Sequence, residues 1–156
     1  MKVTVCAVGK LANLSEERAL TDDYYARFTQ TARPLGWRFE GETEVDDRKS
    51  QGMTAEAELL RKAVPKAARL VTLDERGELM SSPEFATKLT TWADQGDDVC
   101  FIIGGADGID PALRAEADAS LSFGKMVWPH KLVRVMLAEQ LYRAATIQTG
   151  GPYHRA

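Results

Sequence analysis

The chain has 156 residues, a length typical of a single domain, and we expect one domain spanning residues 1–156. Hydrophobic residues make up 44% and charged residues 28%, the balance of an ordinary soluble globular protein. No stretch approaches the ~20 apolar residues of a membrane span, and the opening apolar run is too short for a signal peptide. Membrane and secreted classes are therefore excluded, and we expect a cytoplasmic protein.

The net charge of −3 is unevenly distributed along the chain. From Lys125 onward five basic residues stand against one acid, Glu139, so this part carries +4 and residues 1–124 carry −7. A basic end on an acidic body indicates an anionic partner for that end. The alternative is a C-terminal helix that simply carries solvated basic residues.

Apolar periodicity predicts alternating strands and helices in the first half of the chain. Ser15 is suited to cap the first helix, whose Leu20, Tyr24 and Phe28 share one face, and Pro65 ends the second helix. The predicted elements are a strand at 2–8, a helix at 14–32, a strand at 36–45, a polar loop at 46–52 and a helix at 53–64.

The pattern continues in the second half. Ser82 is expected to cap a helix that has Pro83 at its first position and ends at Gly96, and Asp110 caps a short helix that begins with Pro111. The predicted elements are a strand at 68–74, a turn at 75–80, a helix at 81–96, a strand at 98–103, a short helix at 110–117 and a strand at 118–123.

The last predicted element is the longest, a helix over 129–149 that Pro129 starts and Gly150 ends. Its apolar residues cover more than one face, whereas the surface of one sheet buries only one stripe. A second copy of the chain is the simplest cover for the remainder. We therefore expect a homodimer through this helix.

Alternating strands and helices predict an α/β fold with a mainly parallel sheet flanked by helices. In such sheets ligands lie beyond the carboxyl ends of the strands. The loops after Asp74, Ile103 and Phe123 are therefore the candidate ligand-binding loops.

The loop after Ile103 carries glycines at 104, 105 and 108, which is neither the dinucleotide fingerprint nor a phosphate loop. Asp107 and Asp110 lie in or beside it, and no basic residue is near in sequence, so a phosphate is a poor match. Close backbone approach suits a neutral or cationic ligand. A tight strand-to-helix turn without a ligand is the alternative.

Other common chemistries find little support. The two histidines, His130 and His154, lack metal-ligand spacing, and no serine-hydrolase elbow is present. Cys6 and Cys100 lie in apolar runs, so we expect buried, reduced thiols. The residues alone thus predict an α/β domain with a small-ligand site, and a flavodoxin-like nucleotide-binding domain or a paired-carboxylate hydrolase stays open.

Three segments together resemble one family: FIIGGADG (101–108), LSFGKMVWPHKLVRVMLAEQLYRAATI (121–147) and PYHR (152–155). The similarity also takes in AVGK (7–10) and VTLDERGELMSS (71–82), so it spans essentially the whole chain. The chain resembles the bacterial ribosomal RNA large-subunit methyltransferase H family, which are pseudouridine-N3 methyltransferases of the SPOUT class.

The resemblance implies a deep trefoil knot in the C-terminal part, bound S-adenosylmethionine, a homodimer, and no metal. It implies a pseudouridine in large-subunit (23S) ribosomal RNA of the assembled ribosome as substrate. The cofactor-binding residues carried over are Leu73, Gly104, Phe123, Gly124, Lys125, Met126, Val127 and Trp128. Gly124 stands where a serine is frequent and is expected to loosen the loop, and Ala106 stands where proline or serine is frequent.

The resemblance singles out no catalytic base. The candidates are Tyr153, His154 and Arg155 in the C-terminal tail, with Arg134 and Arg143 on the long helix. An arginine would stabilise the deprotonated imide oxygen rather than take the proton. We expect the tail to reach the cofactor and RNA of the partner chain. The alternatives are a frayed terminus and a non-catalytic ribosome-binding assembly factor that keeps the cofactor pocket.

Overall fold

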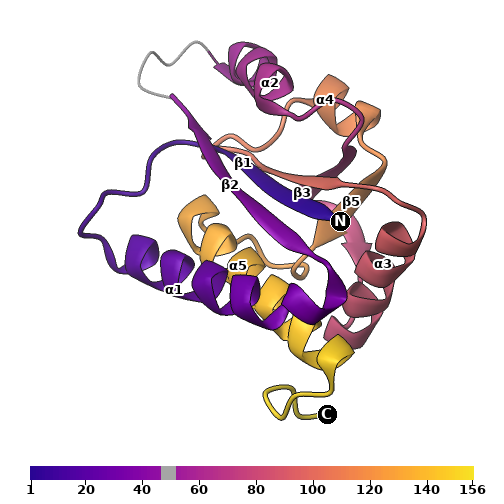
Figure 1. Ribbon diagram of the computed structural model, residues 1–156. Helices are drawn as coiled ribbons and strands as arrows, with labels where there is room; N and C mark the ends of the chain where they lie inside the picture. The colour runs from indigo at the N-terminus through magenta and orange to yellow at the C-terminus, as the bar shows by residue number, and fades with distance from the viewer. Residues whose placement is uncertain (47–51) are drawn as a thin grey trace.

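A computed structural model describes residues 1–46 and 52–156 of the chain. Within these ranges five strands form one sheet, in the order β2-β1-β4-β3-β5, and every pairing is parallel (Figure 1). The elements are β1 (Lys2–Val8), α1 (Glu16–Thr31), the 3₁₀ helix η1 (Arg33–Leu35), β2 (Arg38–Val45), α2 (Gly52–Ala63), β3 (Arg69–Leu79), α3 (Ser82–Asp94), β4 (Val99–Ile103), α4 (Pro111–Glu116), β5 (Ala119–Ser122) and α5 (His130–Thr149).

Helices cover both faces of the sheet, which confirms the predicted α/β class (Figure 1). Helices α1, α3 and α5 cover one face around a core that includes Phe28, Phe101 and Leu141. Helices α2 and α4 cover the other face around a smaller core that includes Ile102 and Leu113. Every residue of the central strand β4 is buried, as expected for a strand between two layers.

Helix α1 is capped by Ser15 as predicted, since the Ser15 side chain accepts from the Arg18 N–H at 3.1 Å. Of the predicted face, Phe28 is buried and Tyr24 is partly buried against the core, whereas Leu20 is exposed. Thr21 and Tyr25 are the other buried residues of α1. The Tyr25 ring stacks on Phe39 at 4.1 Å, and this packing turns Leu20, 48% exposed, away from the core.

The predicted turn at 75–80 is wrong, because β3 continues to Leu79. Its register against β5 shifts between Leu73 and Glu78, so that Leu121 pairs with both. Gly77 allows this crossing: a Cβ there would lie 2.7 Å from the Leu121 backbone. The charged residues of this segment resemble a turn, and the strand pairing that overrides them is not visible from local sequence.

Helix α3 is capped by Ser81, not by Ser82. Ser81 and Glu84 form a capping box, which satisfies two backbone N–H groups at the helix start. The Asp110 cap of α4 is confirmed by bonds from the N–H groups of Ala112 and Leu113. Most of the predicted loop at 46–52 lies outside the described residues.

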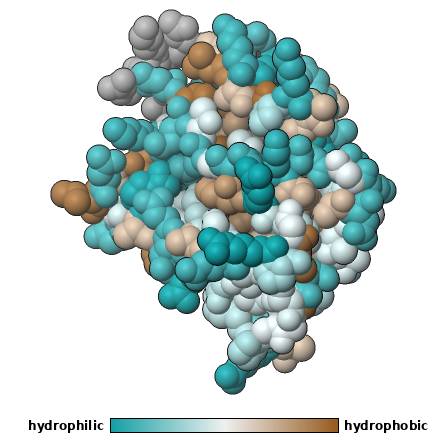
Figure 2. Space-filling view, in the orientation of Figure 1, coloured by the Kyte–Doolittle hydropathy of each residue, from teal (hydrophilic) through white to brown (hydrophobic). Residues whose placement is uncertain are grey.

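Helix α5 packs between α1 and α3 on one face of the sheet. These two helices cover much of the apolar surface that the sequence assigns to a second copy of the chain. What they leave is an apolar groove of about 680 Å³ along α5, lined by Leu20, Tyr24, Leu79, Met80 and Met136 among others. The face seen in Figure 2 is mostly hydrophilic, with hydrophobic residues in separate patches.

The Cys6 and Cys100 side chains are fully buried and unbridged, as predicted, with 3.6 Å between their sulfur atoms. Among the described helices none combines the length and apolar character of a membrane span.

Candidate functional site

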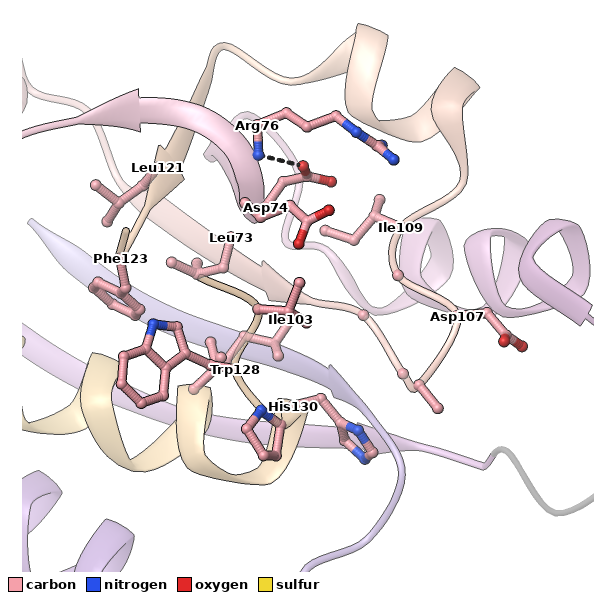
Figure 3. Close-up of a pocket in the computed structure, with 18 of the residues that line it drawn as sticks. Leu73, Asp74, Arg76, Ile103, Asp107, Ile109, Leu121, Phe123, Trp128 and His130 are labelled. Atoms are coloured by element: carbon pink, nitrogen blue, oxygen red, sulfur yellow. Dashed lines mark hydrogen bonds between the residues drawn. The ribbon is translucent and has the colours of Figure 1, made fainter. Parts of the chain in front are cut away.

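A cavity of about 680 Å³ lies beyond the carboxyl ends of β4 and β5, beside residues 73–76 in the middle of β3 (Figure 3). The three predicted loops meet there, together with Val133 at the start of α5 and Met53 on α2. Leu73 and Ile103 lie between Trp128 and Asp107 in Figure 3. The cavity is large enough for a small organic ligand, and its walls are largely apolar.

The glycine loop forms one wall of this cavity. Gly105 and Gly108 form an isolated bridge, and the Gly108 N–H donates to the Gly105 carbonyl at 3.0 Å. A Cβ on Gly104 would lie 2.6 Å from the Gly108 carbonyl oxygen, so no other residue fits there without movement. The loop is therefore a tight turn that also presents its backbone to the cavity.

The segment after β5 forms the opposite wall. The Ser122 hydroxyl accepts from the Gly124 N–H at 3.1 Å and lies 3.1 Å from the Glu75 carbonyl oxygen, which joins this segment to β3. Gly124 has φ +138°, a conformation that side chains rarely adopt. This backbone favours glycine, and the expectation that Gly124 loosens the loop stays a prediction.

Met126, Val127 and Trp128 line the cavity and are 74%, 78% and 42% exposed. They are therefore not core residues. Large apolar side chains beside a cavity are typical of surfaces that a ligand covers. Of the predicted cofactor-binding residues, Leu73, Gly104, Phe123 and Gly124 also line the cavity, whereas the exposed Lys125 does not.

Carboxylates dominate the charged groups of the lining: Asp74, Glu75 and Asp107 stand beside a single arginine, Arg76. The Asp74 side chain is only 7% exposed and accepts from the Arg76 N–H at 2.8 Å and from Arg114 Nη1 at 3.2 Å (Figure 3). Sequence analysis singled out Asp107 but not Glu75 and Arg76, because 75–80 resembles a turn, and it gave Asp74 no role in binding. A cavity with this balance favours a ligand that carries positive charge.

The C-terminal tail forms a second cluster on α5. Glu139 Oε1 accepts from the Tyr153 hydroxyl at 2.8 Å and from Arg143 Nε and Nη2 at 3.0 and 2.6 Å. Burial and the hydrogen bond to Glu139 raise the pKa of Tyr153, so its hydroxyl stays a neutral donor. The cluster holds His154 as well, since Arg143 Nη1 lies 3.2 Å from its Nδ1.

The tail follows the C-terminal end of α5 (Figure 1), whereas the residues of α5 that line the cavity lie at its N-terminal end. Val133 lines the cavity and Thr149 ends the helix, which places them about 24 Å apart along the axis at 1.5 Å per residue. The structure thus brings Arg143, Tyr153 and His154 together, with the exposed Arg155 beyond them, but not to the cavity of the same chain.

Arg134 is not a solvent-facing candidate, because it is 1% exposed. Its guanidinium donates to the Gly9 carbonyl at 2.9 Å and to Glu42 and Glu44, each at 2.6 Å. The partners lie some 90 residues away, so sequence spacing offers no sign of this burial. Arg134 ties α5 to β2 and is removed from the catalytic candidates.

Among the described residues no group of three His, Cys, Asp or Glu side chains could hold a metal ion. The cavity therefore offers apolar walls, backbone groups and carboxylates as its means of binding.

Comparison with known proteins agrees with this architecture. A family model described as a predicted SPOUT methyltransferase matches residues 1–154. The ribosomal RNA large subunit methyltransferase H proteins of Ruegeria sp. strain TM1040 and of Ruegeria pomeroyi are each 60% identical over 156 residues, covering 99% of both chains.

A solved structure, that of a probable methylase family protein from Haemophilus influenzae Rd KW20, superposes with a TM-score of 0.52. It covers 99% of this chain and 70% of its own length at 13% identity, which supports the fold alone.

Proposed function

Because the chain belongs to the SPOUT methyltransferase family, in its ribosomal RNA large subunit methyltransferase H group, we propose that it methylates 23S ribosomal RNA with S-adenosylmethionine. The target atom is N3 of a pseudouridine, and the substrate is the assembled particle. The observation that carries this proposal is 60% identity over 99% of the chain. Membership of this family rules out the alternative of a flavodoxin-like nucleotide-binding domain.

The residues of the cavity fit the cofactor. Leu73, Met126 and Trp128 offer apolar surface for an adenine ring, and the backbone around Gly104 is open to hydrogen bonding. The carboxylates of Asp74 and Asp107 suit the positive charges of the cofactor, whereas a cluster of basic side chains would repel them. When bound, S-adenosylmethionine supplies an activated methyl group on a cationic sulfur.

The chain's own contribution is then positioning and charge stabilisation. The N3 of a neutral pseudouridine carries a proton that it must lose, and negative charge develops on the adjacent carbonyl oxygens. Arg143, His154 and Arg155 are the tail groups able to donate to such an oxygen.

The tail reaches the reaction through a homodimer in this proposal. The groove along α5 shares Leu121, Phe123 and Gly124 with the cavity, and it also includes Glu139, which anchors the tail. A second copy seated two-fold on this groove therefore brings its Glu139 end beside the cavity of the first. That pairing supplies the tail that the chain's own cavity lacks.

The trefoil knot belongs to the same proposal. β5 pairs with β3 at the sheet edge, whereas α5, which follows it, packs between α1 and α3. The connection from Phe123 to Pro129 lines the same cavity as residues 73–76 of β3 and the loop that follows β4, where a threaded chain would run.

The net charge of −3 agrees with a folded particle as substrate better than with free RNA, which is normally bound by basic proteins. The exposed basic residues of this end, Lys125, Lys131 and Arg155, doubled in a dimer, would face the RNA. We place this reaction in the cytoplasm, with the ribosome.

Transfer of a tritiated methyl group to 50S subunits, 70S ribosomes and free 23S RNA tests the proposal. We expect label in the RNA of the assembled particle and little in free RNA. Binding to the particle without any transfer of label would identify the non-catalytic assembly factor instead.

A further inference from the structure

Arg143 has three donor groups engaged in the tail cluster. Nε and Nη2 both donate to Glu139 Oε1, which fixes the plane of the guanidinium and leaves Nη1 directed at His154 Nδ1, 3.2 Å away. A guanidinium has donors and no acceptor, so the Nδ1 atom must be the acceptor. Among the described residues no other hydrogen bond to the His154 ring is present.

A neutral imidazole carries one N–H, and the hydrogen bond from Arg143 assigns it to Nε2. We propose that Glu139 and Arg143 are positioning residues that hold His154 as the Nε2–H tautomer, so that His154 donates to a carbonyl oxygen of the target base and does not remove its proton. This inference rests on the proposed function and names the role of one tail residue in it.

The surrounding contacts hold the tail in this arrangement. The Tyr153 ring lies 4.5 Å from the Tyr142 ring and 4.8 Å from the Arg143 guanidinium, measured between centres. The Tyr153 hydroxyl donates a hydrogen bond to Glu139 Oε1 at 2.8 Å. Glu139 therefore anchors a terminal segment that would otherwise fray. The same carboxylate orients Arg143, which donates to His154.

The tautomer decides what the ring can do. In the reaction the N3 proton would pass to water, which leaves negative charge shared between N3 and the carbonyl oxygens beside it, and an Nε2–H donor stabilises that charge on oxygen. The N3 lone pair of this anion would then form the new N–C bond as the C–S bond breaks with its electron pair left on sulfur. The Nδ1 lone pair, held by Arg143, is not available to take the proton.

Imidazole ¹⁵N shifts of the full-length protein test the tautomer directly. The spectrum is recorded well above the ordinary histidine pKa of about 6.5, and a His154→Gln variant assigns the signal. We expect one pyrrole-type nitrogen at Nε2 and one pyridine-type nitrogen at Nδ1. Arg143→Leu should convert this pattern to averaged shifts, whereas Arg27→Leu, which removes an exposed arginine beside Tyr142, should leave it unchanged. Averaged shifts in the parent protein, or an Nδ1–H tautomer, would overturn the inference.

Two substitutions of His154 test the role. Glutamine keeps an N–H donor near the position of Nε2 but cannot act as a base, and leucine keeps neither. We expect kcat within about tenfold of the parent for His154→Gln and a loss of about 100-fold for His154→Leu, the size of one lost donor to an oxyanion. Equal losses in both would assign proton removal to His154.

The transfer assay and the ¹⁵N measurement can each refute one proposal without refuting the other. A parent protein that transfers no methyl group refutes the proposed function, whatever the ¹⁵N shifts show. Normal transfer with the wrong tautomer refutes only the positioning role of Arg143 and the donor role of His154.

Discussion

Gly104 occupies a position in the cavity wall that excludes a side chain. A methyl group there would lie 2.6 Å from a backbone oxygen and 2.9 Å from the Ile109 side chain, so the loop must shift. We predict that Gly104→Ala lowers the affinity for S-adenosylmethionine at least tenfold, or about 1.4 kcal/mol. Calorimetric titration measures it.

Gly151→Ala is the matched control, because its added methyl makes ordinary contacts at 3.6 Å or more. Its affinity should equal that of the parent. An unchanged affinity in Gly104→Ala would show that the loop does not form the cofactor site.

Arg134 is the second residue with a large expected effect. Replacing it with methionine leaves Glu42, 7% exposed, and Glu44 without the guanidinium that both contact at 2.6 Å. Arg18 still contacts Glu42 at 2.8 Å, so we predict a loss of about 3 kcal/mol in unfolding free energy, the lower end of the range for breaking a buried pair. Urea denaturation measures this loss.

Arg27→Met provides the comparison on the surface, where the pair with Asp23 is 53% exposed on both sides. Its cost should be far smaller, because solvent screens an exposed ion pair. Similar costs for both variants would contradict the assignment of Arg134 to a structural role.

At the scale of elements, the tail is separable from the cavity. It contacts the C-terminal half of α5, and among the described residues that line the cavity none belongs to it. We predict that deletion of residues 152–156 leaves cofactor binding within a factor of two or so and abolishes transfer. Titration and labelled-methyl transfer on the same preparation measure both, and transfer that survives the deletion would refute the role of the tail.

Most elements were predictable because their signals are local. Ser15 and Asp110 cap helices as their sequence positions indicate, and the glycine loop follows its strand as predicted. The errors came from contacts between distant elements. The pairing of β3 with β5 extends a strand through a charged segment, and the burial of Arg134 depends on residues of β2.

The candidate site also has parts that are predictable from local sequence and parts that are not. The loop after Ile103 is a candidate ligand loop from its own residues, with a plain tight turn as the alternative. Its partner wall at Met126 and Trp128 became a candidate through the family resemblance alone. The carboxylate of Asp74 and its partner Arg114 are 40 residues apart, so neither spacing nor composition could join them.

At the scale of the molecule, the apolar groove along α5 is the surface that a second copy should cover. Met136 lines it, whereas Leu132, 41% exposed on the same helix, does not. We predict that Met136→Glu produces monomers and loses transfer, because a buried unpaired charge would oppose the interface. Leu132→Glu should remain dimeric.

Sedimentation velocity at micromolar concentration measures this. A parent protein that sediments as a monomer, or a Met136→Glu variant that remains dimeric, would contradict the proposed interface.

We propose that this chain methylates N3 of a pseudouridine in 23S RNA within the assembled particle. Nucleoside mass spectrometry of 23S RNA, isolated from ribosomes treated with the protein and S-adenosylmethionine, tests it most directly. We predict N3-methylpseudouridine that is absent from untreated ribosomes and from ribosomes treated with the chain lacking residues 152–156. A methyl group on another nucleoside, or none, would contradict the claim.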